Sequence, residues 1–171
     1  LRELAAAAAR VIPPLPFGRD ELSAHRYVLP AHEYDDRNNL ENCALYTVFP
    51  FPIYGVGRDD LEVGRTTWQH RPFRMSHGWS QDGIQAALLG LADEAQRIVS
   101  AHALQRNNDY RFPAFWGPNF DWVPDMDHGG SMMTALQRMA LQSHPDSLHV
   151  TPAWPADWNG WFLLHGHDGV R

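Results

Sequence analysis

Apolar residues recur at helical spacing in four segments of the chain, and this pattern predicts four amphipathic helices. The expected helices span Arg58–Gln69, Ser80–Leu89, Ala92–Leu104 and Ser131–Gln142. Gly90 separates the second helix from the third by a short break, so we expect these two to form a helical hairpin.

The remaining segments predict little further regular structure. Leu1–Ile12 is rich in alanine, the best helix former, and is ended by Pro13 and Pro14. Residues 16–39 are polar, so we expect them to be mostly irregular. Short strand-like pieces after Ser147 predict at most a small sheet. The expected fold class is therefore mainly α, with helical hairpins leading into a short β-rich C-terminal segment.

The two ends suggest a piece of a longer protein. The chain begins with Leu1 inside a helical pattern that has no N-cap residue before it, and it stops within strand-like sequence. We therefore expect further residues upstream. Expressed alone, such a piece should expose apolar helix faces to solvent.

The composition and charge of the chain argue against several classes of protein. Apolar residues make up 44% of the 171 residues, which is enough for a core, and the net charge is −6 without any Lys/Arg run. The chain therefore lacks the basic footprint of a nucleic-acid binder. Its apolar stretches are too short to span a bilayer. Cys43 is the only cysteine, which excludes an internal disulfide, and its apolar context predicts a buried, inert thiol.

The segment from Phe112 to Gly130 combines acids, aromatics, prolines and glycines without periodicity, which predicts an irregular loop. Such a loop suits the lining of a cleft. Its candidate ligand-binding residues are Trp116, Asn119, Trp122 and Asp125, and its candidate catalytic residue is Asp127, followed by His128. The glycines after Asp127 would let a ligand approach closely. Alternatively, Asp125 and Asp127 only cap the helix expected after them.

Two further polar segments offer ligand-binding candidates. His77, Trp79, Gln81 and Asp82 lie where the second helix begins, and Glu41 and Asn42 precede an apolar run. A flat indole suits the apolar face of a pyranose ring, while amides and carboxylates bind hydroxyl groups. Each candidate also has a purely structural interpretation. The tryptophans can fill the core, Asp82 can complement the helix dipole, and Glu41 and Asn42 can belong to a polar loop.

The sequence does not support a metal site, a nucleophilic serine or a phosphate-binding loop. Asp127 and His128 raise the possibility of a metal site, but neither H-x-x-x-H nor H-x-H precedes them, so we expect no metal and no cofactor. There is no G-x-S-x-G and no phosphate-binding glycine loop. Trp154, Trp158 and Trp161 are spaced through a proline-containing tail, and we expect all three to pack in the core.

Four stretches, in order, resemble glycoside hydrolase family 95, whose members are α-L-fucosidases and related enzymes on an (α/α)6 barrel. The stretch "HGWSQDGIQAALLGLADEAQRIV" is similar to that family's G-W-S helical hairpin. The stretch "DMDHGGSMMTALQRMALQSH" resembles the segment that carries its catalytic aspartate. The stretches "LYTVFP" and "VTPAWPADW" are similar to its L-Y-x-L-Y-P run and to the approach to its C-terminal β-domain.

This resemblance implies a domain organisation and a mechanism. Residues 1–146 would be the C-terminal portion of an (α/α)6 catalytic barrel, and residues 147–171 the start of a β-rich domain or a linker. Asp127 falls on the family's general base, which activates water in an inverting hydrolysis, while the general-acid glutamate falls upstream of Leu1. The partners would be an oligosaccharide or polysaccharide and the remainder of the catalytic domain. The family favours a periplasmic or secreted location.

This sequence departs from the family at two places. His128 and Gly129 replace the family's glycine–asparagine pair, and "NNLENCA" replaces a histidine-rich stretch. The sugar therefore need not be fucose. A non-catalytic glycan-binding module or a degenerate barrel is the alternative function, and a helical interaction scaffold is a third.

Overall fold

The computed structural model describes residues 2–34, 40–76, 78–106 and 126–167, with only the backbone described for Met126. The described part is mainly helical, as the sequence predicts. In chain order its elements are α1 (Arg2–Ala9), β1 (Phe17–Arg19), β2 (Arg26–Val28), the 3-10 helix η1 (Cys43–Thr47), α2 (Leu61–Gln69), α3 (Asp82–Leu88), α4 (Ala92–Leu104), α5 (Met126–Ala140), β3 (Leu141–Ser143) and β4 (Leu148–Val150).

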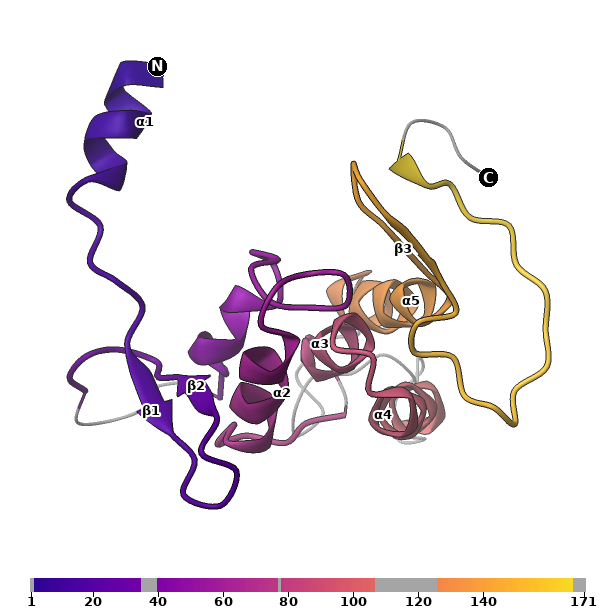
Figure 1. Cartoon of the computed structure of the whole chain (residues 1–171). Coiled ribbons are helices and arrows are strands. Elements are labelled where there is room, and N and C mark those ends of the chain that lie inside the picture. The colour runs from indigo at the N-terminus through magenta and orange to yellow at the C-terminus, as the bar shows by residue number, and fades with distance from the viewer. Residues whose placement is uncertain (1, 35–39, 77, 107–125, 168–171) are drawn as a thin grey trace.

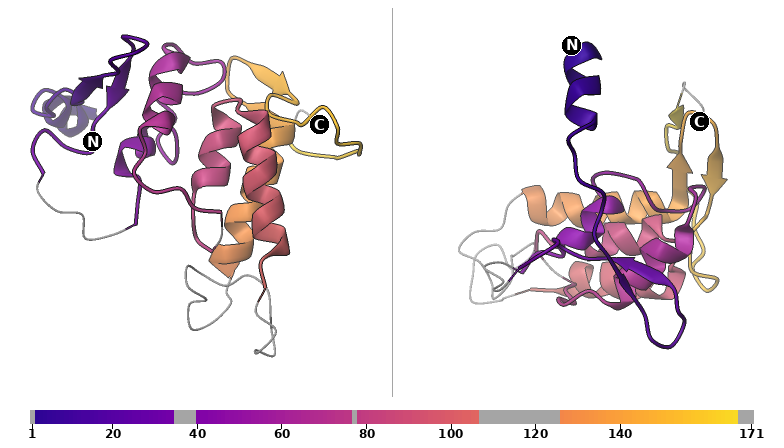
Figure 2. Two further views of the ribbon diagram at one scale, coloured as in Figure 1. Left: turned by 90° about the horizontal axis from the view of Figure 1, so that it is seen from below. Right: turned by 60° about the vertical axis from the view of Figure 1, so that its left-hand side comes forward.

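Helices α3, α4 and α5 pack side by side and form the centre of the molecule (Figure 2). Gly83 permits this close packing, because a Cβ there would lie 3.1 Å from the Cβ of Ala135 on α5. Gly90 ends α3 with a positive φ of 69°, a conformation that glycine adopts without strain. The hairpin predicted from the break at Gly90 is thus formed by α3 and α4.

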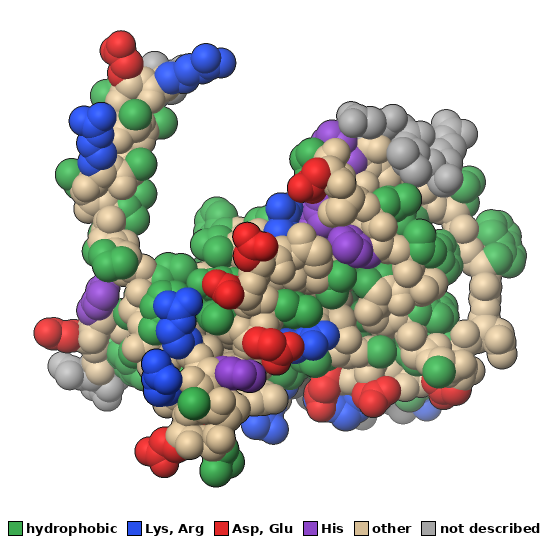
Figure 3. All heavy atoms as spheres, viewed as in Figure 1, with side chains coloured by type: hydrophobic (Ala, Val, Ile, Leu, Met, Phe, Trp, Pro, Cys, Tyr) green, Lys and Arg blue, Asp and Glu red, His purple; other side chains and the backbone are tan. Residues whose placement is uncertain are grey.

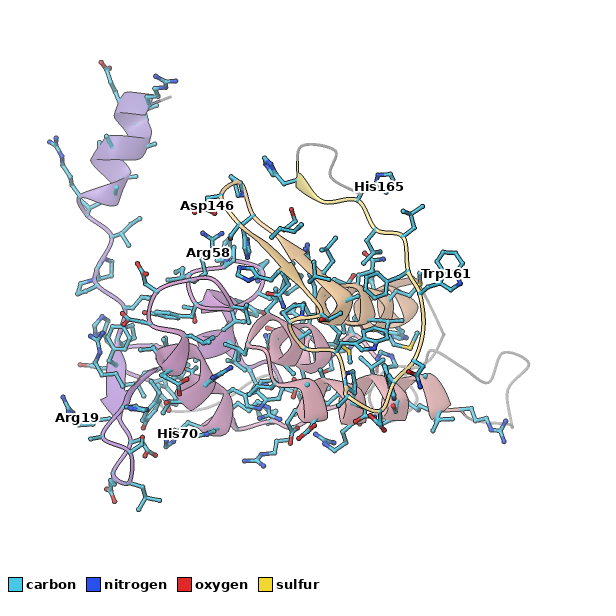
Figure 4. All side chains as sticks on the ribbon, turned by 45° about the vertical axis from the view of Figure 1, so that its right-hand side comes forward. Arg19, Arg58, His70, Asp146, Trp161 and His165 are labelled. Carbon is cyan, nitrogen blue, oxygen red and sulfur yellow. The ribbon has the colours of Figure 1, made fainter. Side chains whose placement is uncertain are left out.

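The apolar core lies between this bundle, α2 and η1. Leu45, Leu89 and Met139 are fully buried in it. The half-buried Trp154 and Trp158 pack against it from the C-terminal segment, as predicted. The prediction for Trp161 was wrong, because its side chain is 89% exposed on an extended segment, where it points away from the body (Figure 4).

The predicted helices all form, but several ends differ. Helix α4 has the predicted bounds, whereas α2 begins at Leu61 because Asp60 before it has a left-handed backbone. Helix α5 begins at Met126, five residues before the predicted Ser131, so the segment from Asp127 to Gly130 is helical rather than irregular. The first turn of α5 was not predicted because Gly129 and Gly130 follow it, and glycine is a poor helix former.

Two β-hairpins complete the fold. Hairpin β1–β2 lies in a segment predicted to be irregular, and it is held to α2 by the amide of Val28, which donates to Thr67 Oγ1 at 2.9 Å. Hairpin β3–β4 begins directly after α5, with Gln142 opposite His149. Gln142 therefore belongs to a strand and not to the end of a helix. Its side chain is buried and donates to the carbonyl oxygen of Ala87 at 2.7 Å.

Helix α1 stands apart from the rest of the molecule and contributes no buried residue (Figure 1). Its apolar side chains are accessible on the face shown in Figure 3, where basic and acidic side chains are interspersed. Cys43 was expected to be buried, but it is exposed at the start of η1. Leu45, two residues further along this short helix, is fully buried.

A cluster of two histidines and an arginine holds hairpin β3–β4 against the loop before α2. Nη2 of Arg58 donates to Nδ1 of His144 at 3.1 Å, and the His144 and His149 rings meet edge to face. Arg58 and Asp146 lie close to this hairpin in Figure 4. Burial, Arg58 and His149 lower the pKa of His144, against smaller opposite effects of Asp146 and the Val56 backbone. Nδ1 can accept from Arg58 only while the ring is neutral.

Stability should therefore fall as the pH drops below the ordinary histidine pKa of about 6.5. In that range the unfolded chain binds a proton at His144 that the folded chain disfavours, so the folded state loses stability. We expect His144→Gln to reduce the loss of unfolding free energy between pH 8 and pH 5.5, measured by urea titration. The exposed His165→Gln is the control, and an unchanged pH slope in His144→Gln would contradict this role.

Candidate functional site

One open cavity of about 490 Å³ lies where α3 and α5 begin. Its lining consists of Glu41, Phe49, Trp79, Gln81, Ile84, Asp127, Gly130, Ser131 and Thr134. The structure thus places four of the sequence candidates, Glu41, Trp79, Gln81 and Asp127, around one space. They come from three segments that are far apart in the sequence.

The orientation of the helices explains this convergence. Helices α3 and α5 both begin at the same end of the bundle (Figure 2). The Ser131 hydroxyl lies 2.9 Å from the carbonyl oxygen of Gly78 and 3.1 Å from that of His128, so it can donate to either. The bond to Gly78 ties the first turns of α5 to the turn that carries Trp79.

Asp127 lies in the first turn of α5, and its side chain is exposed at the cavity. The unpaired backbone N–H groups of a first helical turn favour a negative charge there. His128, the next residue, is only 2% exposed and lines none of the cavities described here. We therefore assign His128 to packing rather than to ligand contact.

A smaller cavity of about 30 Å³ adjoins the first and shares Glu41, Trp79 and Gln81 with it. Such a volume can hold about one water molecule or one hydroxyl group. Gln81 and Gln85 both line it, and the Oε1 atom of each is buried without a hydrogen-bond partner among the described residues. A buried polar atom without a hydrogen-bond partner lowers the stability of the fold, so a hydrogen-bond donor near these two oxygens would be favourable.

Sequence reasoning missed Gln85. The sequence does mark Gln85 as unusual, because this glutamine is a polar residue within an otherwise apolar helical segment, one turn after Gln81. Residues four apart lie on the same face of a helix, so the two amides share a direction.

Asp82 lines the smaller cavity and belongs to a buried polar cluster. Its carboxylate pairs with Arg71 at 3.1 Å, and the two side chains are 5% and 3% exposed. It also accepts from the Met75 amide at 3.1 Å, from the Ser80 hydroxyl at 3.2 Å and from Asn42 at 3.4 Å. Burial lowers the pKa of Arg71, and the Asp82 carboxylate opposes that effect. These bonds occupy the Asp82 carboxylate.

Asn42 belongs to the same cluster. Its amide nitrogen donates to the Phe73 carbonyl at 3.0 Å, and its Oδ1 accepts from the Phe73 amide at 3.2 Å. Asn42 and Asp82 therefore hold the loop between α2 and α3, which carries Trp79 and Gln81. Both were candidates for ligand contact, and the structure gives both a positioning role.

Glu41 differs from Asn42 because its side chain is exposed. One carboxylate oxygen accepts a hydrogen bond from the Tyr46 hydroxyl at 3.0 Å. Burial and Glu41 together raise the pKa of Tyr46, so this hydroxyl stays a donor. The Glu41 carboxylate is thereby fixed at the cavity. The other sequence candidates, His77, Trp116, Asn119, Trp122 and Asp125, lie outside the described residues.

Within the described ranges, no group of three or more His, Cys, Asp or Glu side chains is arranged to hold a metal ion. None of the helices in that part of the chain has the length and apolar character needed to cross a membrane. Comparisons with protein families, with curated proteins and with solved structures gave no match.

The buried pair should dominate local stability. Asp82→Asn leaves the Arg71 charge buried without a partner, and we expect it to lower the unfolding free energy by about 3–5 kcal/mol. Glu62→Gln breaks the exposed pair with Arg65, 3.0 Å apart, and should cost at most about 1 kcal/mol. Chemical denaturation measures both. Equal losses would show that the buried cluster does not hold the loop.

Proposed function

We propose that this protein is a glycoside hydrolase that acts on a neutral glycan through the cavity bounded by Asp127 and Trp79. The observation that carries the proposal is that a carboxylate, Asp127, and an indole, Trp79, line one open cavity together with Glu41 and Gln81. The resemblance to glycoside hydrolase family 95 supports the same residue, Asp127, in the catalytic role.

The chemistry of the lining favours a sugar over charged ligands. Glu41 and Asp127 are carboxylates, whereas Gln81 and Thr134 are neutral groups that both donate and accept hydrogen bonds. Sugar hydroxyls can pair with both kinds of group. A phosphate or carboxylate ligand would meet the like charge of Glu41 and Asp127. The half-buried Trp79 adds a flat apolar surface for the C–H face of a pyranose.

In this proposal Asp127 is the general base of an inverting hydrolysis. Its carboxylate accepts a proton from water as that water attacks the anomeric carbon, and a carboxylic acid on the opposite face protonates the leaving oxygen. By the resemblance, that acid is a glutamate upstream of Leu1. Glu41 and Gln81 bind hydroxyl groups and fix the ring.

The same proposal extends to the fold. The antiparallel hairpin of α3 and α4 and its packing against α5 are consistent with one sector of an (α/α)6 barrel. In such a barrel the helix starts gather at one rim, which is where Asp127 and Trp79 meet. An α-L-fucoside or a related sugar is the substrate that the resemblance suggests.

Asp127→Asn should remove catalysis but keep binding. The substitution keeps the shape of the side chain and removes the proton acceptor, so we expect turnover of aryl glycosides by the full-length protein to fall about 10²–10⁴-fold. Glycan affinity, measured by titration calorimetry, should change little. Asp93→Asn, on the exposed face of α4, is the matched control. Binding without any turnover in the unmodified protein would identify a glycan-binding module instead.

Gly130 offers a test of the cavity itself. A Cβ at this position would meet nothing within 4 Å, so Gly130→Ala should be accepted and should stabilise α5 by about 0.5–1 kcal/mol. Gly130→Trp should fill the cavity and abolish glycan binding while the protein still melts cooperatively. Calorimetric titration and thermal melts of the two variants check this. Normal glycan affinity in Gly130→Trp would place the binding site elsewhere.

A further inference from the structure

A second cavity of about 500 Å³ lies on the other side of Glu41, between β2, η1 and the end of α2. It is lined mainly by apolar groups from the segments 27–34, 43–45 and 67–72. Two tyrosine rings, Tyr27 and Tyr34, belong to the lining. Its volume is in the range of pockets that take small organic ligands. Glu41 and Asn42 line this cavity and also the smaller one beside Trp79.

Most polar groups of this second cavity are already engaged with the protein. Thr67 Oγ1 donates to the Val63 carbonyl at 2.7 Å and accepts from the Val28 amide at 2.9 Å. Arg71 and Asn42 are held by the Asp82 cluster.

His70 is engaged as well. Its ring stacks on Tyr27 at 3.9 Å, and its Nε2 lies 2.8 Å from Asp20 Oδ2. Bonds to Ser23, followed by His70, strongly lower the pKa of Asp20, so that carboxylate is ionised and fixes the histidine. A ligand with several hydroxyl groups would therefore find few partners, whereas an apolar ring would fit the lining.

We infer that this cavity binds an apolar, aromatic aglycone of the glycoside whose sugar occupies the Asp127 cavity. The inference rests on the proposed function for the identity of the ligand. Glu41 lines both this cavity and the Asp127 cavity, so the two cavities meet at this residue. The bond between sugar and aglycone would lie at that point. Tyr34 supplies aromatic contact surface, and Glu41 offers one polar contact for the linking oxygen or a neighbouring hydroxyl.

Cys43 makes this cavity directly measurable. It is the single cysteine of the chain, it is exposed, and it lines the second cavity. The probe is p-cresol, and the readout is the rate of Cys43 modification by a maleimide, followed by intact-protein mass spectrometry. At ten times its dissociation constant, p-cresol should slow the modification about tenfold, because the free fraction falls by that factor. L-fucose at the same concentration should leave the rate unchanged.

Two variants in which tryptophan replaces an alanine test the location of p-cresol binding. Ala31 lines the cavity, so Ala31→Trp should fill it and remove the protection by p-cresol. Ala103→Trp, on the exposed face of α4, should keep that protection. Thermal melts verify that both variants fold. The inference is overturned if p-cresol gives no protection, if protection persists in Ala31→Trp, or if only a disaccharide protects.

The design separates this inference from the proposed function. Protection by p-cresol needs neither sugar binding nor turnover. Protection without hydrolysis of any glycoside would therefore support the second cavity as a binding site and contradict the proposed enzyme activity. Hydrolysis that depends on Asp127, with no protection at Cys43, would support the enzyme activity and contradict the binding role of the second cavity. If both hold, aryl glycosides should have a lower KM than methyl glycosides, and Ala31→Trp should abolish that difference.

Discussion

The buried Asp82 carboxylate is the constraint on which the candidate site depends. It binds Arg71 from the end of α2, the Met75 amide from the following loop, Ser80 from the approach to α3 and Asn42 from the segment before η1. A charge this deeply buried is stable only while its partners stay in place. The loop that presents Trp79 and Gln81 to the cavity is therefore fixed in place.

This arrangement divides the polar residues into two groups. Asp82 and Asn42 satisfy one another and neighbouring loop groups, and so they position the site. Glu41, Gln81, Gln85 and Asp127 line the cavities, and so they define what can bind. A negatively charged lining beside an indole selects a neutral ligand with many hydroxyl groups. That selection is the physical basis for proposing a glycan.

The sequence predicted helix existence well and helix ends less well, for identifiable reasons. Apolar periodicity located α2 to α5, and the bounds of α4 were correct because no glycine or proline disturbs it. The start of α5 was misplaced because Gly129 and Gly130 are typical of a loop, although both lie within the helix. Hairpin β1–β2 was missed because its strands are three residues long and its fixing bond comes from Thr67, far along the chain.

For the candidate site, the same limits apply. Residue type and spacing singled out Trp79, Gln81 and Asp127, which the structure brings to one cavity. The partners of a carboxylate cannot be deduced from spacing, so Asp82 was indistinguishable from a ligand-binding acid until its contact with Arg71 was visible. Gln85 was overlooked because an apolar helix suggested a core residue. Long-range hydrogen bonds, which no local pattern encodes, decided these assignments.

The most direct measurement of the central claim is a crystal structure of the protein soaked with an oligosaccharide it binds. The account predicts a pyranose ring stacked on Trp79, with a hydroxyl group bonded to the exposed Glu41 carboxylate and a water molecule held between Asp127 and the anomeric carbon. A sugar bound away from this cavity, or an Asp127 carboxylate turned from the bound sugar, would contradict it.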